Sequence, residues 1–167
     1  MEFPIRRSLR LRNYDYSTAG GYFITICTDQ KKCILSHIEQ GTELDRASIQ
    51  LTRLGYIAKE TIMDLQTRYS ISIDSFVIMP NHIHMIVVLE KCEKIRTIGQ
   101  IIGAYKSLVT KQWRELCNAN GIKMEKLWQR NYYEHVIRND SDYWEKTKYI
   151  EENPDKWSAD REYISVI

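Results

Sequence analysis

Two histidines separated by one residue are the first feature of the sequence that could support chemistry. His82 and His84 directly follow Met79-Pro80-Asn81. In a β-strand, alternate side chains project from the same face, so these two imidazoles lie about 7 Å apart along the chain and could share one divalent cation. The apolar residues that follow predict a central strand covered on both faces, with the histidines near its open end. The alternative is that each histidine is a hydrogen-bonded polar residue at the end of a hairpin.

A tyrosine and an asparagine four residues apart supply the further groups that such a site needs. Tyr149 and Asn153 precede Pro154, and residues four apart lie on the same face of a helix. An asparagine oxygen could complete a metal site that two imidazoles begin. A phenol beside that metal could attack a bound phosphodiester, although its pKa of about 10 requires activation by position and positive charge. The metal would polarise the phosphoryl oxygen.

The position of the proline limits where this pair can lie on its helix. The residue before a proline is disfavoured in helical geometry, so Asn153 must belong to the last turn or the cap. The alternative for Tyr149 is a half-buried structural tyrosine, since the chain contains 11 tyrosines.

Hydrophobic periodicity predicts the elements that would hold these groups. We expect strands at 22–28, 71–79, 82–90 and 128–138, a weaker hairpin within 33–51, and helices at about 53–67, 98–116 and 141–153. Helices that follow pairs of strands pack on one face of an antiparallel sheet. The sequence therefore predicts a ferredoxin-like α+β fold, with two long helices on one face and a short C-terminal helix and a ligand on the other.

Length and composition exclude several classes of protein. The chain has 167 residues, 43% hydrophobic and 28% charged, which predicts one globular domain, 1–167, and excludes disordered and fibrous proteins. No apolar stretch approaches the roughly 18 residues of a membrane span, and the N-terminus lacks the apolar region of a signal peptide. The four cysteines form no C-x-x-C pair, which predicts reduced thiols rather than zinc ligands. We expect a cytoplasmic protein that does not associate with a membrane.

Positive charge is unevenly distributed along the chain. The net charge is +2, yet residues 5–12 carry four arginines and no acid, and residues 101–138 carry seven Lys or Arg against three Glu. A basic strip suits a polyanion, although solvated faces of ordinary proteins give the same pattern. Aromatic residues beside cations, as in 127–133, offer stacking surfaces for unpaired bases.

Taken together and in this order, several segments resemble the HUH single-tyrosine transposase superfamily, and most closely its REP-associated tyrosine transposases in the IS200-like family. The resemblance extends from about residue 5 to 160. Its segments are the H-x-H after Met-Pro-Asn, Leu127-Trp-Gln-Arg-Asn-Tyr-Tyr-Glu-His-Val-Ile-Arg-Asn139, Tyr149-Ile-x-x-Asn-Pro154, Arg6-Arg-Ser-Leu-Arg-Leu-Arg-x-Tyr-Asp-Tyr16, 21–28 and 101–107.

This resemblance implies cleavage and rejoining of single-stranded DNA by an HUH endonuclease. Tyr149 would attack the scissile phosphate to give a 5′-phosphotyrosine and a free 3′-OH, and the reverse attack would reseal the strand. His82 and His84 match the family's metal-binding pair and Asn153 matches its third ligand. The family's metal is Mg²⁺ or Mn²⁺.

The resemblance also implies a DNA hairpin with an unpaired flank as the partner, and association with the nucleoid when the protein is bound to DNA. The phosphate contacts that we expect are Arg6, Arg7, Arg10 and Arg12 of a basic N-terminal arm of about 1–16, together with Lys106, Arg130 and Arg138. The expected base contacts are Trp128, Gln129 and His135.

The resemblance determines neither the DNA target nor the oligomeric state. Residues 155–160 depart from the apolar Val-x-x-Gly stretch of many relatives, so target preferences do not transfer, and the protein could act as a monomer or a homodimer. Two other functions remain: a non-catalytic module that binds single-stranded nucleic acid, and a hydrolase in which a metal-bound water attacks.

Overall fold

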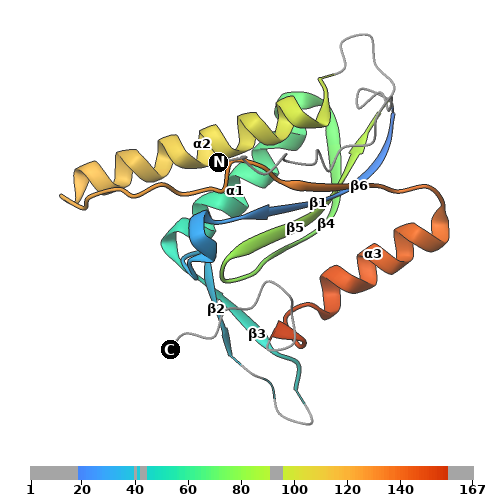
Figure 1. The fold of residues 1–167 in the computed structure, drawn as a ribbon, viewed down its shortest axis with the longest axis horizontal. Helices are drawn as coiled ribbons and strands as arrows, with labels where there is room; N and C mark the ends of the chain where they lie inside the picture. Colours follow the sequence, from blue (N-terminus) through green and yellow to red (C-terminus); the bar gives the residue numbers. More distant parts are fainter. Residues whose placement is uncertain (1–18, 40, 42–44, 91–95, 158–167) are drawn as a thin grey trace, which may run out of the picture.

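A four-stranded antiparallel sheet carries the histidine pair. The computed structural model describes residues 19–39, 41, 45–90 and 96–157 (Figure 1). The strands lie in the order β4-β5-β1-β6. Their bounds are Gly20–Cys27 for β1, Ile71–Ile78 for β4, His82–Leu89 for β5 and Tyr133–Val136 for β6. Among the strands of this sheet, the first helix comes between β1 and β4 and the second between β5 and β6, which gives the β-α-β-β-α-β arrangement of a ferredoxin-like fold. The predicted fold class is confirmed.

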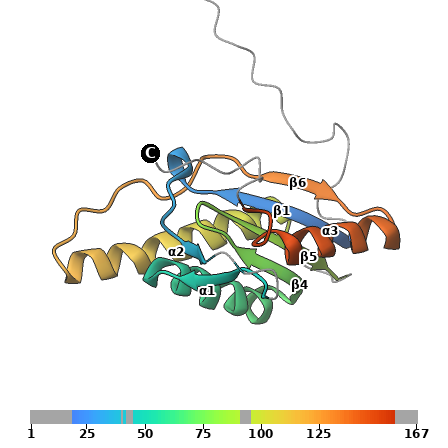
Figure 2. The same ribbon diagram turned by 90° about the horizontal axis from the view of Figure 1, so that it is seen from below.

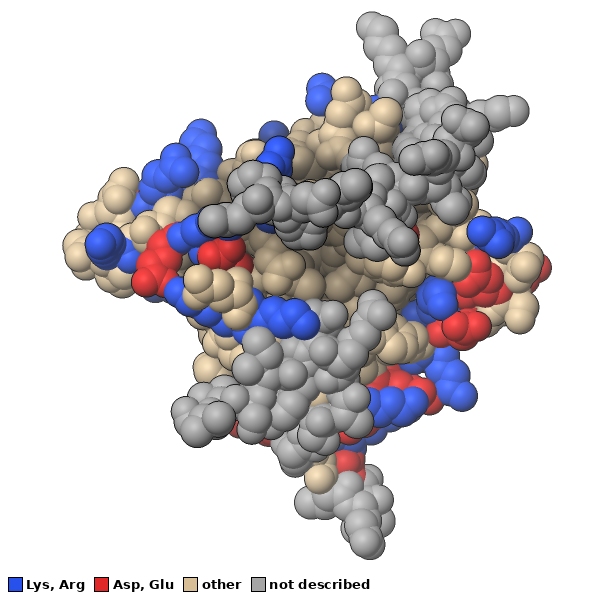
Figure 3. All heavy atoms as spheres, in the orientation of Figure 1, with Lys and Arg blue, Asp and Glu red and all other residues tan. Residues whose placement is uncertain are grey.

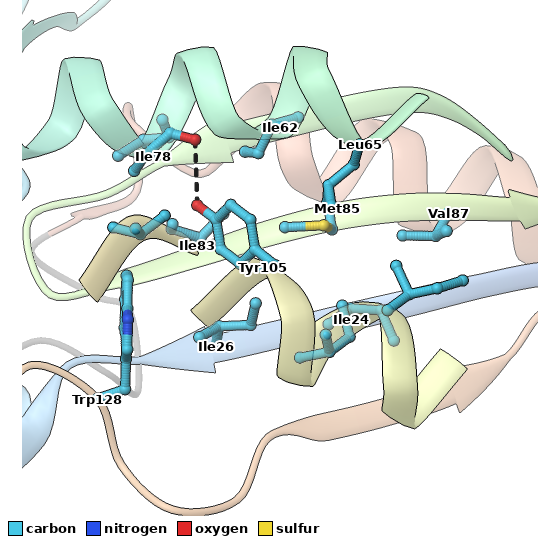
Figure 4. Packing of buried hydrophobic residues seen from close by; sticks show 14 of the residues in the cluster. Ile24, Ile26, Ile62, Leu65, Ile78, Ile83, Met85, Val87, Tyr105 and Trp128 are labelled. Carbon is cyan, nitrogen blue, oxygen red and sulfur yellow. Dashed lines mark hydrogen bonds between the residues drawn. The ribbon is translucent and has the colours of Figure 1, made fainter. Parts of the chain in front are cut away.

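Two long helices cover one face of this sheet. They are α1, Arg53–Tyr69, and α2, Ile98–Ala119, and each begins at the predicted cap: Thr52 accepts a hydrogen bond from the backbone of Gly55, and Thr97 forms a capping box with Gln100. The larger core lies between these helices and the sheet. It includes Ile24 and Ile26 of β1, Ile83, Met85 and Val87 of β5, Ile62 and Leu65 of α1, and Tyr105 of α2 (Figure 4).

The third helix lies on the opposite face of the sheet (Figures 1 and 2). This helix, α3, Asp140–Glu152, begins at Asn139, whose side chain accepts a hydrogen bond from the backbone of Asp142. Its Ile150 packs in a second cluster with Phe23 of β1 and Ile86 of β5. Alternation along the strands places one set of side chains against α1 and α2 and the other against α3.

A separate two-stranded sheet supports the end of α3. It consists of β2, Ser36–Glu39, and β3, Ser48–Leu51, which confirms the predicted hairpin. Ile38 and Ile49 pack against the second cluster, and the backbone N–H of Ala47 donates to Asp155 Oδ1 at 2.7 Å. The segment that ends α3 is therefore anchored to this hairpin.

The last predicted strand is shorter than expected. We predicted a strand over 128–138, but regular pairing with β1 covers only β6, and Trp128 makes an isolated bridge to Thr28. Between the bridge and β6, the Lys106 ammonium of α2 donates to the carbonyls of Gln129 and Asn131, at 2.9 and 3.0 Å.

A helix that crosses a bilayer needs about 20 mostly apolar residues. Within the part of the chain that the structure describes, no helix is both long enough and apolar enough to do so.

Candidate functional site

The two histidines lie at the start of β5, between β4 and β1. They are more deeply buried than the prediction of an open strand end suggested, with 0% of His82 and 1% of His84 exposed. Their ring centroids are 4.4 Å apart and the ring planes meet at 65°. The β-strand period therefore places both imidazoles on one face, as the sequence predicted, and there the two rings lie against each other.

Each imidazole is held by a hydrogen bond at its Nδ1 atom. His82 Nδ1 lies 2.8 Å from Asn81 Oδ1, and His84 Nδ1 lies 2.9 Å from Thr25 Oγ1. Thr25 reaches His84 because the two residues are direct partners in the β1–β5 register. With Nδ1 engaged in this way, Nε2 is the nitrogen of each ring that suits a metal ion, because metal-bound histidines normally use their second nitrogen in a supporting hydrogen bond.

Tyr149 of α3 lies against this pair. Its ring centroid is 5.2 Å from that of His84, in an edge-to-face arrangement at 70°, and 5.9 Å from that of Phe23. Phe23 in turn stacks on His84 at 5.2 Å. Tyr149 is 39% exposed. Its ring therefore contacts a buried histidine of the same chain while part of the side chain stays accessible to solvent.

Asn153 is buried one turn beyond Tyr149, on the same side of α3. It forms the helix C-cap, which agrees with the prediction from Pro154. Four residues further, Trp157 packs near His82 with its ring centroid 6.0 Å away. Asn153 therefore lies in the chain between Tyr149, which contacts His84, and Trp157, which contacts His82.

The chemistry of these side chains fits a divalent cation. Among residues 19–39, 41, 45–90 and 96–157, no three His, Cys, Asp or Glu side chains are grouped so that they could hold one metal ion. A site here would therefore combine the two imidazoles with an amide oxygen. Imidazole nitrogen and amide oxygen are both ligands of first-row divalent transition metals, of which Mn²⁺ is one.

The residues predicted to contact DNA lie in several different environments. Arg6, Arg7, Arg10 and Arg12 lie outside the described residues. Arg130 and Arg138 are exposed and Gln129 is half-buried. His135 on β6 faces Asp142 of α3, with Nε2 2.8 Å from the carboxylate, so this side chain joins β6 to α3.

Trp128 occupies a position that the prediction of a base contact did not anticipate. Only 6% of it is exposed, and its ring centroid lies 6.2 Å from that of Tyr105 in the larger core (Figure 4). Its ring faces are covered by the core, so Trp128 is a packing residue in this structure rather than a stacking surface.

Basic side chains are unevenly distributed over the surface. In the view of Figure 3 they predominate over α2 and the segment that follows it, whereas acidic and basic side chains are mixed over α3. The exposed basic residues of the first region are Lys111, Arg114, Lys123 and Lys126. Arg130 follows them in the chain and is also exposed. The charge asymmetry of the sequence is thus also an asymmetry of the surface.

Lys106 has a structural role that its sequence position did not reveal, because its ammonium is directed at the carbonyls of 129–131. Desolvation by burial lowers the pKa of Lys106 to about 8, against an opposing effect of nearby Cys27. Between pH values of about 8 and 10.5, the Lys106 side chain is protonated in the unfolded chain but mostly neutral in the folded chain. The free energy of unfolding therefore rises with pH over this range.

We therefore expect the free energy of unfolding of the wild type, relative to that of Lys106→Met, to increase as the pH rises from about 8 to 10.5. Urea denaturation at several pH values measures this difference. A difference that decreased over this range would show that the charged form is the one favoured by folding.

Several residues of the site carried no assignment from the sequence. Asn81 precedes His82 directly, and this adjacency was a signal that could have identified it. Thr25, Phe23 and Trp157 reach the imidazoles only through strand pairing and the packing of α3. Nothing local in the sequence marks them.

The chain is similar to known proteins in both sequence and fold. The family model described as "Transposase IS200 like" matches residues 22–153. A protein of Haemophilus influenzae described as uncharacterized is 35% identical, with 95% of this chain and 93% of that protein covered. A REP-associated tyrosine transposase of Escherichia coli K12 is 28% identical over 67% of this chain and 61% of its own length.

Among solved structures, a REP-associated tyrosine transposase bound to a REP hairpin has a similar fold. The TM-score is 0.59 with 23% identity, and the match covers 89% of this chain and 73% of that one. The family model spans both the imidazole pair and Tyr149, up to and including Asn153. On this evidence the chain belongs to the IS200-like transposase family.

Proposed function

We propose that this protein cleaves and rejoins single-stranded DNA next to a hairpin, with Tyr149 as the nucleophile. The observation that carries the proposal is the position of the phenol, 5.2 Å between ring centroids from His84 of a buried imidazole pair and partly open to solvent. A purely structural tyrosine would not need to lie against a buried imidazole while it stays partly exposed. In a transposase, this arrangement supports attack on a phosphodiester.

The reaction conserves phosphodiester bonds. The Tyr149 oxygen forms a bond to the scissile phosphorus, and the bond from phosphorus to the 3′ oxygen breaks. The phenol loses its proton to solvent, and the departing 3′ oxygen takes one up, leaving a 5′-phosphotyrosine and a 3′-OH. Attack by a 3′-OH on the phosphotyrosine reverses these changes. Rejoining needs no external energy source because one phosphodiester replaces another.

His82, His84 and Asn153 would hold a divalent cation, which we propose to be Mg²⁺ or Mn²⁺. When bound, such a cation supplies Lewis-acid polarisation of the phosphoryl oxygen and orients the scissile group. Neutral imidazoles and an amide add no negative charge, so these side chains do not repel the phosphate. The burial of both histidines and their Nδ1 hydrogen bonds restrict how far the rings can turn.

The proposed substrate is a hairpin with an unpaired flank. It is supported by membership of the transposase family and by the similar fold of a protein that binds a REP hairpin. The exposed Arg130 and Arg138 are candidates for phosphate contacts. We expect the protein to act in the cytoplasm, in association with the nucleoid.

The test is incubation of the full chain with labelled hairpin DNA that carries a single-stranded flank, in the presence of Mn²⁺. We expect a covalent protein–DNA adduct that survives denaturing electrophoresis, disappears after protease treatment and does not form with EDTA. Cleavage without an adduct would favour attack by water. Binding without cleavage would favour a module that only binds nucleic acid. Either result would overturn the proposal.

A further inference from the structure

We infer that Asn81 is a positioning residue, which fixes the proton of His82 on Nδ1 and thereby reserves Nε2 for the cation. This inference deepens the proposed function and rests on it. The histidines alone do not determine which nitrogen of each ring carries the proton, because a neutral imidazole has two tautomers. A metal ligand must present the nitrogen that lacks a proton.

The argument begins with the chemistry of an amide oxygen. Asn81 Oδ1 lies 2.8 Å from His82 Nδ1, and both side chains are fully buried. An amide oxygen accepts hydrogen bonds and cannot donate one, so Nδ1 must carry the proton. The lone pair of His82 is then on Nε2. If the amide were turned so that its NH₂ faced the ring, the proton would lie on Nε2 instead, and the ring would be in the wrong tautomer for a metal.

The turn that carries Asn81 is held from both sides. The backbone N–H of Thr28 donates to the Asn81 carbonyl at 2.9 Å, and the Thr28 hydroxyl lies between that carbonyl, at 3.0 Å, and the carbonyl of Lys32, at 2.9 Å. The N–H of Leu35 donates to the Pro80 carbonyl at 3.0 Å, and the N–H of Met79 donates to that of His82 at 2.9 Å. These bonds fix the backbone at Asn81, so its amide reaches His82 from a rigid position.

His84 is held by a group with different chemistry. Its partner, Thr25 Oγ1, is a hydroxyl that can donate or accept by rotation. Thr25 is therefore compatible with both tautomers of His84. Asn81 is compatible with only one tautomer of His82, so it prepares that ligand before any metal arrives.

The first measurement is the tautomer of His82 in the metal-free full chain, from ¹⁵N NMR of the imidazole nitrogens. We expect the Nδ1–H form in the wild type and in Asn81→Asp, because a carboxylate also accepts from Nδ1. In Asn81→Ala the acceptor is gone, and we expect a mixture of tautomers.

The second measurement is the affinity for Mn²⁺ alone, by titration calorimetry. Loss of a group that orients a metal ligand typically weakens binding by about 10–100-fold, and we expect this loss for Asn81→Ala but recovery for Asn81→Asp. Ser36→Ala is the matched control: the buried Ser36 hydroxyl donates to the Ile78 carbonyl at 2.9 Å beside the turn of the same hairpin, and neither imidazole takes part in this bond. It should lower thermal stability without changing the tautomer.

The two proposals fail in different ways. A wild-type His82 with its proton on Nε2, or an Asn81→Ala protein with unchanged tautomer and Mn²⁺ affinity, would overturn the role of Asn81 even if the DNA adduct forms. So would an equal loss of Mn²⁺ affinity in Ser36→Ala. If the tautomer and the affinities follow expectation but no adduct forms with DNA, the role of Asn81 stands and the proposed reaction fails.

Discussion

Tyr149→Phe is expected to eliminate the covalent protein–DNA adduct and to lower strand cleavage by at least about 10³-fold, as is usual when a nucleophile is removed. Phenylalanine keeps the ring that packs edge-on against His84 and Phe23, so the fold and the imidazole pair are retained. Only the oxygen that would bond to phosphorus is lost. Denaturing electrophoresis of reactions with labelled hairpin DNA and Mn²⁺ measures the adduct, and a mobility shift without metal measures binding.

The matched control is Tyr143→Phe. Tyr143 lies on the same helix and its hydroxyl donates to Asp74 Oδ2 at 3.1 Å, so this variant also removes a phenolic hydroxyl from α3. We expect it to form the adduct at close to the wild-type rate. An adduct in Tyr149→Phe would place the nucleophile at another residue and contradict the proposed reaction.

His82→Ala and His84→Ala are each expected to lower cleavage by at least about 10²-fold, because each removes one of the proposed ligands of the cation that polarises the phosphate. DNA binding should persist, since the exposed arginines are outside the imidazole pair. Both histidines are buried, so each change should also cost about 1–3 kcal/mol of folding free energy. Calorimetric titration with Mn²⁺, thermal denaturation and a cleavage assay separate the two effects.

His37→Ala provides the control, because His37 is exposed on β2. We expect wild-type cleavage and Mn²⁺ affinity from it. Binding should be compared at one salt concentration, since phosphate contacts make affinity strongly dependent on salt. Wild-type cleavage by a folded His82→Ala or His84→Ala protein would show that the imidazole pair is structural.

The elements of this fold were largely predictable because their signals are local. Thr52, Thr97 and Asn139 cap their helices as their side-chain chemistry predicts. The hairpin at Pro80-Asn81 likewise follows from two apolar runs that meet at turn residues. The exception is the strand predicted over 128–138. There the carbonyls of Gln129 and Asn131 accept hydrogen bonds from Lys106, on a helix whose position local sequence patterns cannot give.

The predicted role of Trp128 illustrates a second limit. An aromatic residue beside Gln129 and Arg130 has the composition of a base-stacking segment, and the same residue has the volume to fill a core. Composition does not distinguish these uses. Burial does, and Trp128 packs with Tyr105 between α2 and the sheet.

By itself, the sequence determined that His82 and His84 share a strand face and that Tyr149 and Asn153 share a helix face, because periods of 2 and 3.6 residues act over a few positions. The tertiary structure alone decided that these two faces meet. The contact between Tyr149 and His84 depends on the register of β1 against β5 and on the packing of α3 through Ile150. Such contacts join residues far apart in the chain, so they form only when the whole sheet and its second core assemble.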